Sequence, residues 1–167
     1  KNKQTTSGEV TELMPAFDTA GAVTGDWIVQ REMADAEKLN PIVSNDASAD
    51  EICGYIFETL NTFDLEKWDM VPKLASLPVE SADHLEYTYD LRKDIKFSDG
   101  HPMDAADVIF TMKVVKNPLV DCASLRNYFE SVDRVEMVNN DPYKFKFILS
   151  KPYWRMAYSI GLLKGIM

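Results

Sequence analysis

Two short stretches of this chain alternate between apolar and polar residues, and this alternation is the strongest constraint on its fold. They cover residues 85–91 and 143–149. Successive side chains of a β-strand point to opposite faces, so each stretch predicts a strand with one packed face and one wet face. The positions predicted to be packed are Leu85, Tyr87, Tyr89, Leu91, Tyr143, Phe145, Phe147 and Leu149. Residues 132–138 are predicted to pair with the second strand across a turn at residues 139–142.

Two helices are predicted where a capping residue precedes apolar residues at helical spacing. Ser48 and Glu51 have the spacing of a capping box, and Asp104 and Asp107 take the same positions before a second helix that ends at Asn117. The predicted buried positions are Ile52, Cys53, Ile56, Phe57 and Leu60 in the first helix, and Val108, Ile109, Met112 and Val115 in the second.

The rest of the chain completes an α+β pattern. Residues 1–24 are rich in Thr, Ser and Gly and predict a flexible lead-in, followed by a first strand over residues 27–33. Residues 121–130 predict a short helix, and residues 153–163 predict a last helix. Because hairpins and helices are segregated, we expect an α+β fold with a mixed sheet rather than a strictly alternating parallel one.

Charge and composition exclude several classes of function. The formal net charge is −9, and the basic residues are scattered, so no basic stripe indicates a nucleic-acid partner. No apolar run approaches the ~20 residues that cross a bilayer. The two cysteines form no CxxC motif and there are only two histidines. We therefore expect no metal site and no cofactor.

Five segments resemble motifs of one protein family, and they occur in the family's order. Leu39-Asn40-Pro41 fits its "L-N-P" motif, and residues 56–60, IFETL, fit "I-Y-E-G-L". Residues 75–100 include EYTYDLRKDIKFSDG and lead into PMDAADVIFT at residues 102–111. Residues 141–149 fit "D-x-Y-x-V-x-F-x-L". Together these segments resemble the bacterial extracellular solute-binding proteins of family 5, the peptide-binding subunits of ABC importers.

The resemblance implies a two-lobed fold like that of type II periplasmic binding proteins. It covers about residues 26–151, with Thr59 and Asp94 where the family usually has Gly. Residues 25–167 are then expected to form the N-terminal portion of the solute-binding domain, including its accessory α+β subdomain. The second lobe and the carboxylate that holds a peptide's α-amino group are expected beyond Met167.

The function that the resemblance implies is capture of a solute outside the cytoplasm, without catalysis. The expected ligand is a peptide; a nickel complex, a sugar, another small solute, or a module that no longer binds ligand are the alternatives. The expected partners are the membrane permease subunits of an ABC importer, and the expected form is a monomer. The implied location is the periplasm or the cell surface, with a lipid anchor before residue 1 as a further expectation.

The predicted ligand-binding residues are Ala34, Asp35 and Ala36. In the family, the segment before "L-N-P" borders the cleft, where its backbone can pair with an extended peptide. The alternative interpretation is an acidic, exposed loop that leaves a strand. The side chains of Asp35 and Glu37 have three interpretations: attraction of a ligand amine, binding of a surface cation, or plain exposure to solvent.

No set of residues indicates an enzyme. Glu51, Glu58 and Asp107 are possible paired carboxylates, but helix capping already explains two of them. Neither His84 nor His101 has a nucleophile tied to it by spacing.

The cysteines and tryptophans are read as structural residues. Cys53 is predicted to be a small buried hydrophobe, and a disulfide with Cys122 is left open because spacing gives no distance between them. Trp27, Trp68 and Trp154 are far apart in the sequence, which favours three separate packing sites over one sugar-stacking platform.

Overall fold

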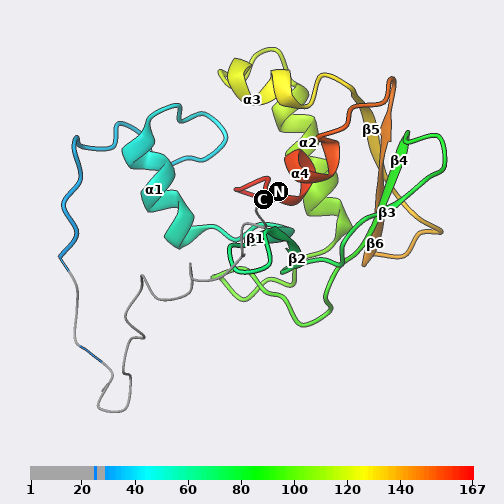
Figure 1. Ribbon diagram of the computed structural model, residues 1–167, viewed down its shortest axis with the longest axis horizontal. Coiled ribbons are helices and arrows are strands. Elements are labelled where there is room, and N and C mark those ends of the chain that lie inside the picture. Colours follow the sequence, from blue (N-terminus) through cyan, green and yellow to red (C-terminus); the bar gives the residue numbers. More distant parts are fainter. Residues whose placement is uncertain (1–24, 26–28) are drawn as a thin grey trace, which may run out of the picture. The chain divides into compact units, whose positions relative to one another are not determined.

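The computed structural model describes residue 25 and residues 29–167, and the chain divides into two units, Lys1–Arg31 and Glu32–Met167. Every helix and strand described belongs to the second unit (Figure 1). In chain order they are α1 (Ala47–Ile56), β1 (Asn61–Asp64), β2 (Asp69–Pro72), β3 (Val79–Glu80), β4 (Glu86–Asp90), α2 (Ala105–Lys116), α3 (Ala123–Tyr128), β5 (Val132–Met137), β6 (Lys144–Leu149) and α4 (Met156–Gly161). The predicted lead-in, residues 1–24, lies outside the described residues.

A four-stranded antiparallel sheet in the order β3-β4-β6-β5 contains both alternating stretches. Tyr87 lies opposite Phe147 and Tyr89 lies opposite Phe145, so four aromatic side chains share one face. All four are at most 3% exposed, and the rings of Tyr89 and Phe145 stack with their centroids 5.5 Å apart. Burial of this many aromatic rings makes the face the centre of the core, as the alternation predicted.

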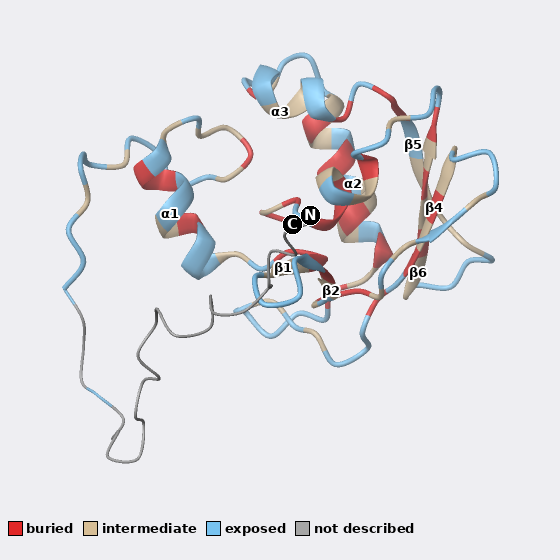
Figure 2. Ribbon diagram, in the orientation of Figure 1, coloured by how far each residue is buried: buried red, intermediate tan, exposed pale blue. Residues whose placement is uncertain are grey.

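Helix α2 covers the packed face of the sheet and starts where the sequence predicted. Asp104 accepts a hydrogen bond from the Ala106 amide at 2.6 Å, and the Asp107 carboxylate accepts one from the Asp104 amide at 2.8 Å. This is a capping box made of two aspartates. Val108, Met112 and Val115 are buried in the same core as the sheet aromatics, whereas Ile109 is only half-buried. Figure 2 shows buried residues repeating along α2 and the neighbouring strands.

Helix α1 begins two residues before the predicted start. Its N-cap is Asp46, whose carboxylate accepts a hydrogen bond from the Ala49 amide at 2.6 Å, so the predicted capping box at Ser48 is wrong. Ser48 instead lies buried within the first turn. Asp46 is as good a cap as Ser, and its charge also favours the positive end of the helix dipole. Ile56, predicted to be buried, is 58% exposed.

The β1–β2 hairpin was not predicted, and Asn61 connects it to the main sheet. The Asn61 side chain is fully buried, and its Nδ2 donates to the carbonyls of Leu60, Ala75 and Ser76 at 3.0–3.1 Å. Ser76 in turn donates its amide to the Asp90 carbonyl of β4. One buried amide therefore holds the start of the hairpin against a loop that runs beside the sheet.

Two further predictions about elements are corrected by the structure. Residues 29–33 form no strand; residues 27 and 28 lie outside the described part. Val29 is 75% exposed and Met33 fully exposed, so β-prone side chains alone do not make a strand here. The last helix is shorter than predicted, since α4 spans six residues, whereas the short helix predicted near residues 121–130 is confirmed as α3.

Cys53 is buried as predicted, whereas the described tryptophans differ from the prediction. Cys53 and Cys122 are both buried and both free, so they do not form a disulfide. Trp68 and Trp154 are 75% and 84% exposed, so neither packs in the core, although the Trp68 ring meets Phe63 edge-on with centroids 6.2 Å apart. Trp27 lies outside the described residues. Within the described part of the chain, no helix is both long and apolar enough to span a membrane.

Candidate functional site

The predicted binding residues Ala34, Asp35 and Ala36 lie in an irregular segment before α1, in which the backbone bends at residues 33, 34 and 37. Ala34 and Asp35 are exposed and Ala36 is half-buried. None of their backbone groups forms a hydrogen bond with another residue of the described part of the chain. Because a backbone amide and carbonyl each require a partner or water, this segment is open to a ligand or to another strand.

The turn that follows is held by Asn40 and by packing on the C-terminal segment. The Asn40 side chain accepts a hydrogen bond from the Ile42 amide at 2.9 Å, and its carbonyl accepts one from the Ser44 amide at 2.9 Å. A Cβ on Gly165 would come within 2.5 Å of the Pro41 ring, so the turn lies directly against this glycine. With Ile42 buried in the core, the turn fixes where the open segment ends.

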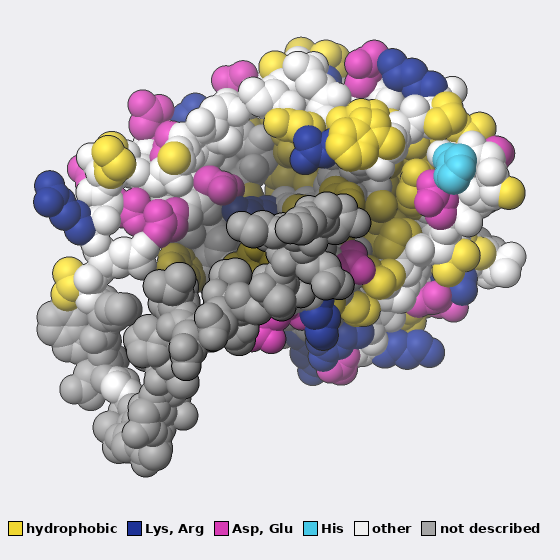
Figure 3. Space-filling view, in the orientation of Figure 1, with side chains coloured by type: hydrophobic (Ala, Val, Ile, Leu, Met, Phe, Trp, Pro, Cys, Tyr) yellow, Lys and Arg dark blue, Asp and Glu magenta, His cyan; other side chains and the backbone are white. Residues whose placement is uncertain are grey.

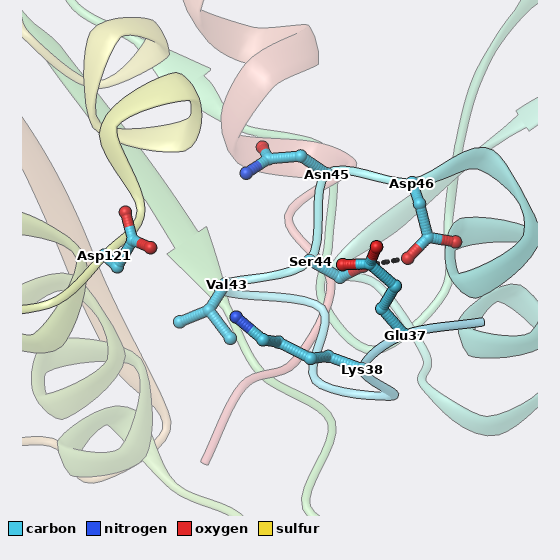
Figure 4. A pocket seen from close by; sticks show the side chains of 7 residues that line it. All are labelled: Glu37, Lys38, Val43, Ser44, Asn45, Asp46 and Asp121. Atoms are coloured by element: carbon cyan, nitrogen blue, oxygen red, sulfur yellow. Dashed lines mark hydrogen bonds between the residues drawn. The ribbon is translucent and has the colours of Figure 1, made fainter.

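A pocket of about 250 Å³ adjoins this segment (Figure 4). It is lined by Glu37, Lys38, Val43, Ser44, Asn45, Asp46 and Asp121. Six of these come from the loop that leads into α1, and Asp121 faces them from the chain just before α3, as Figure 4 shows. Among these residues, the sequence pattern points only to Glu37 as a candidate for binding. Nothing in the sequence relates Asp121 to a loop so far away along the chain.

The carboxylates of the pocket are not equally available. Asp46 uses one oxygen to cap α1 and the other to accept a hydrogen bond from the Ser44 hydroxyl at 3.1 Å. Glu37 and Asp121 are both exposed, and Lys38 is the one cationic residue of the lining. Chemically the pocket can attract a cationic group or donate to a carbonyl through Asn45.

The other candidate residues have structural roles or are exposed. Asp107 closes the capping box of α2, and Glu58 forms an ion pair with Lys73 at 3.4 Å. Glu51 is exposed on α1, and His101 is exposed after its turn. His84 Nδ1 lies 2.7 Å from Glu80 Oε1. In the part of the chain that the structure describes, no three His, Cys, Asp or Glu side chains are grouped to hold a metal ion.

Comparison with known families identifies the fold described above. The family of bacterial extracellular solute-binding proteins, family 5 (middle region), matches residues 69–166, which include the whole four-stranded sheet and α2. The chain belongs to family 5 of the bacterial extracellular solute-binding proteins. The resemblance found in the sequence is thereby confirmed.

Curated relatives of this family 5 chain are named as binding proteins. It is 32% identical over 117 residues to the glutathione-binding protein GsiB of Salmonella paratyphi A, covering 69% of this chain and 22% of the relative. It is 31% identical over 101 residues to a probable ABC transporter-binding protein of Deinococcus radiodurans, covering 56% of this chain and 16% of the relative. The chain thus spans about a fifth of the length of these relatives.

Solved structures show the type II periplasmic-binding-protein fold. NikZ of Campylobacter jejuni, in complex with Ni(L-His), is 30% identical, with a TM-score of 0.67 over 78% of this chain and 25% of that one. OppA of Listeria monocytogenes, bound to peptide, aligns with a TM-score of 0.69 over 78% of this chain and 28% of that one. At 19% identity, OppA supports the fold alone. The family 5 chain is therefore α+β in class and of the predicted fold type, but the predicted mixed sheet is wrong, because both described sheets are antiparallel.

Proposed function

We propose that this chain is part of the extracytoplasmic solute-binding subunit of an ABC importer, and that the whole protein binds peptides. Membership of family 5 supports the class, and one observation supports the peptide. The backbone at Ala34, Asp35 and Ala36 is exposed or half-buried and makes no hydrogen bond with another described residue. Backbone groups that are not already paired within the chain are available for β-augmentation by a peptide.

In this proposal the three residues contribute through their main chain. Hydrogen bonds from main-chain groups hold an extended peptide without reading its side chains, which suits uptake of mixed peptides. The second lobe closes over the ligand from the other side, and closure is the signal that the permease subunits detect. The protein works as a monomer in the periplasm or at the cell surface and catalyses no reaction. A lipid anchor before residue 1, with residues 1–24 as its tether, belongs to the same proposal.

The first test identifies the ligand. Mass spectrometry of what co-purifies with the longer protein that contains this chain should find peptides. Glutathione or a nickel complex would place it with relatives such as GsiB or NikZ instead. If nothing co-purifies, and scattering shows no closure with peptide mixtures, the alternative of a module without a working cleft is correct.

A second test separates main-chain recognition from recognition by a carboxylate. In the longer protein, Ala36→Pro removes one amide donor, and Ala36→Ser is the matched control that keeps it. Calorimetry should show peptide affinity reduced about tenfold by Ala36→Pro and nearly unchanged by Ala36→Ser. Asp35→Asn should also have little effect. A large loss with Asp35→Asn alone would show that Asp35 holds the ligand's amine, contrary to the proposal.

A third test concerns the 167-residue chain alone. Without a second lobe most of a peptide stays in water, while the loss of translational and rotational freedom, at least about 4 kcal/mol, must still be offset. We expect millimolar or weaker binding by the chain when the longer protein binds at micromolar or better, a gap of about 4 kcal/mol. Equal affinities would show a self-sufficient site within residues 1–167.

A further inference from the structure

A second pocket lies at the β3 edge of the sheet, on elements separate from the segment before α1. Its volume is about 540 Å³, and it is lined by Glu80, His84, Tyr87, Pro152, Tyr153 and Trp154. Three of these belong to the β3–β4 hairpin and three to the segment that follows β6. Figure 3 shows hydrophobic side chains gathered over the sheet side of the visible face, next to a histidine and acidic side chains.

The Glu80 carboxylate is held in a fixed position within this pocket. Its Oε1 accepts a hydrogen bond from the Tyr87 hydroxyl at 2.6 Å, and His84 Nδ1 lies 2.7 Å from the same oxygen. The second oxygen, Oε2, has no partner among the described residues. Glu80 and Tyr87 are paired across the two strands, so sheet geometry brings the carboxylate to the hydroxyl.

The hairpin that carries His84 is itself well braced. The His84 amide donates to the Ser81 carbonyl at 3.0 Å, the Ser81 hydroxyl donates to Asp83 at 2.6 Å, and His84 has a left-handed backbone with φ of 59°. Two hydrogen bonds lower the pKa of Glu80 from its ordinary value. The bond from Tyr87 has the larger effect, and the bond from His84 the smaller. The carboxylate is therefore charged at neutral pH and is oriented before any ligand arrives.

The opposite wall consists of aromatic rings. Tyr153 is half-buried against the core, and Trp154 is 84% exposed. The Trp154 ring already accepts one cation, because the Arg155 guanidinium carbon lies 5.3 Å from its centroid. An exposed indole beside an ionised carboxylate is a combination that suits a positively charged group with an apolar body.

We propose that this pocket binds an aliphatic primary ammonium ion, with its N–H groups donating to Glu80 and its carbon chain lying against Tyr153 and Trp154. The Oε2 atom of Glu80 can accept a hydrogen bond, so it favours a ligand with N–H donors. The aromatic rings favour a cation that carries apolar carbons over a hydrated metal ion. The net charge of −9 favours the approach of a cation. The pocket is complete within residues 80–154, so it does not depend on the proposed peptide site or on a second lobe.

The test is a titration of the isotope-labelled 167-residue chain with n-butylammonium, followed by nuclear magnetic resonance. The indole N–H signal of Trp154 should shift and saturate, while that of Trp68, on the β1–β2 hairpin turn, should stay in place. n-Butanol has the same apolar body without the charge and should leave both signals unchanged. Equal shifts for Trp68 and Trp154, equal effects of the alcohol, or no saturable shift would overturn the proposal.

Two variants sharpen this test. Glu80→Gln keeps an oxygen for Tyr87 but removes the charge, and should weaken binding ~10-fold or more. Glu86→Gln is the matched control: Glu86 is at the start of β4, pairs with Lys146 at 3.1 Å and does not line the pocket, so affinity should stay within about twofold. Similar affinity for Glu80→Gln and the unchanged chain would overturn the proposal.

A third variant, at the exposed Trp154, keeps the proposal testable if Glu80→Gln destabilises the β3–β4 hairpin. Trp154→Ala removes one ring of the wall and leaves the Glu80–Tyr87 hydrogen bond in place, so the fold should be kept. It too should weaken butylammonium binding several-fold, read from the shift of the Leu85 and Glu86 amides. Unchanged binding by this variant would show that the aromatic wall has no part in the site, contrary to the proposal.

Discussion

The four-stranded sheet with α2 and the segment of residues 32–46 before α1 differ in where their polar and apolar groups find partners. In the sheet, backbone groups pair between strands, and side chains such as Tyr89 and Phe147 are fully buried. In the segment, Met33 is fully exposed and Leu39 is 51% exposed, and the contacts that anchor the chain lie in its second half, at the Asn40 turn and at the buried Ile42. Stability is therefore concentrated in the sheet, whereas the segment is left free to contact other molecules.

The largest expected effect on stability comes from substituting an apolar residue by Asp, and it should differ between the sheet and the segment of residues 32–46. Tyr87→Asp buries a carboxylate in the core opposite Glu80 and should cost several kcal/mol, roughly 3–5, or unfold the chain. Leu39→Asp, in the segment, should change the free energy of unfolding by about 0.5 kcal/mol or less. Urea denaturation measures both, with Glu86→Ala as the control on the wet face of β4. Comparable losses for all three would contradict the contrast between the regions.

An intermediate effect is expected at Asn61, where the β1–β2 hairpin meets the loop beside the sheet. Asn61→Ala removes the buried donor of the Ala75 and Ser76 carbonyls, whereas the Leu60 carbonyl keeps its bonds from backbone amides, and the change should cost about 1–3 kcal/mol. Asn45 is the matched control, because it is exposed in the segment, and Asn45→Ala should cost no more than about 0.5 kcal/mol. Thermal unfolding would distinguish them; an equally small loss at Asn61 would mean that the hairpin does not rely on this amide.

Smaller effects should separate the two helix caps. Asp104→Ala at α2 and Asp46→Ala at α1 should each cost about 1 kcal/mol, the usual loss for a removed N-cap. Ser48→Ala should cost clearly less, because Ser48 lies inside the first turn of α1. Chemical denaturation of the three variants checks the order. If Ser48→Ala were the most damaging, α1 would start at the residue suggested by the sequence pattern.

The smallest expected effect concerns the thiols. Cys53 lies on α1 and Cys122 precedes α3, and both are buried and free. Burial raises the pKa of the Cys53 thiol, which lowers its thiolate fraction. A reductant should therefore leave the melting temperature unchanged, and both thiols should react with a thiol reagent only after unfolding. A lower melting temperature in reductant would show that an intramolecular disulfide does form.

Much of the sheet region could be predicted from sequence because its signals are local. The alternation of residues 85–91 specifies which side chains share a face. The burial of Tyr87 and Tyr89 in β4 agrees with it. The Asp104 and Asp107 pair starts α2 as predicted, since a cap depends only on residues three positions apart. The β5–β6 hairpin follows from its turn residues.

The segment before α1 was less predictable, since its conformation depends on neighbours. Val29 and Met33 favour a strand by composition, but a strand also needs a partner, and none lies beside them in the described residues. Asp46 and Ser48 are both good N-caps, and local sequence does not choose between them. Whether Ala34, Asp35 and Ala36 contact a ligand stays a prediction for the same reason.

The sequence by itself determined the family and which strand side chains are packed, because the motifs and the strand periodicity lie in consecutive residues. It predicted a mixed sheet, whereas every strand pair described is antiparallel. Only the tertiary structure decided that Asp121 faces Asp46 across a pocket and that Glu80 meets Tyr87 opposite Trp154. It also left Cys53 and Cys122 unpaired. Each of these depends on distances between residues far apart in the chain, and such distances are set by how the helices and sheet pack rather than by local pattern.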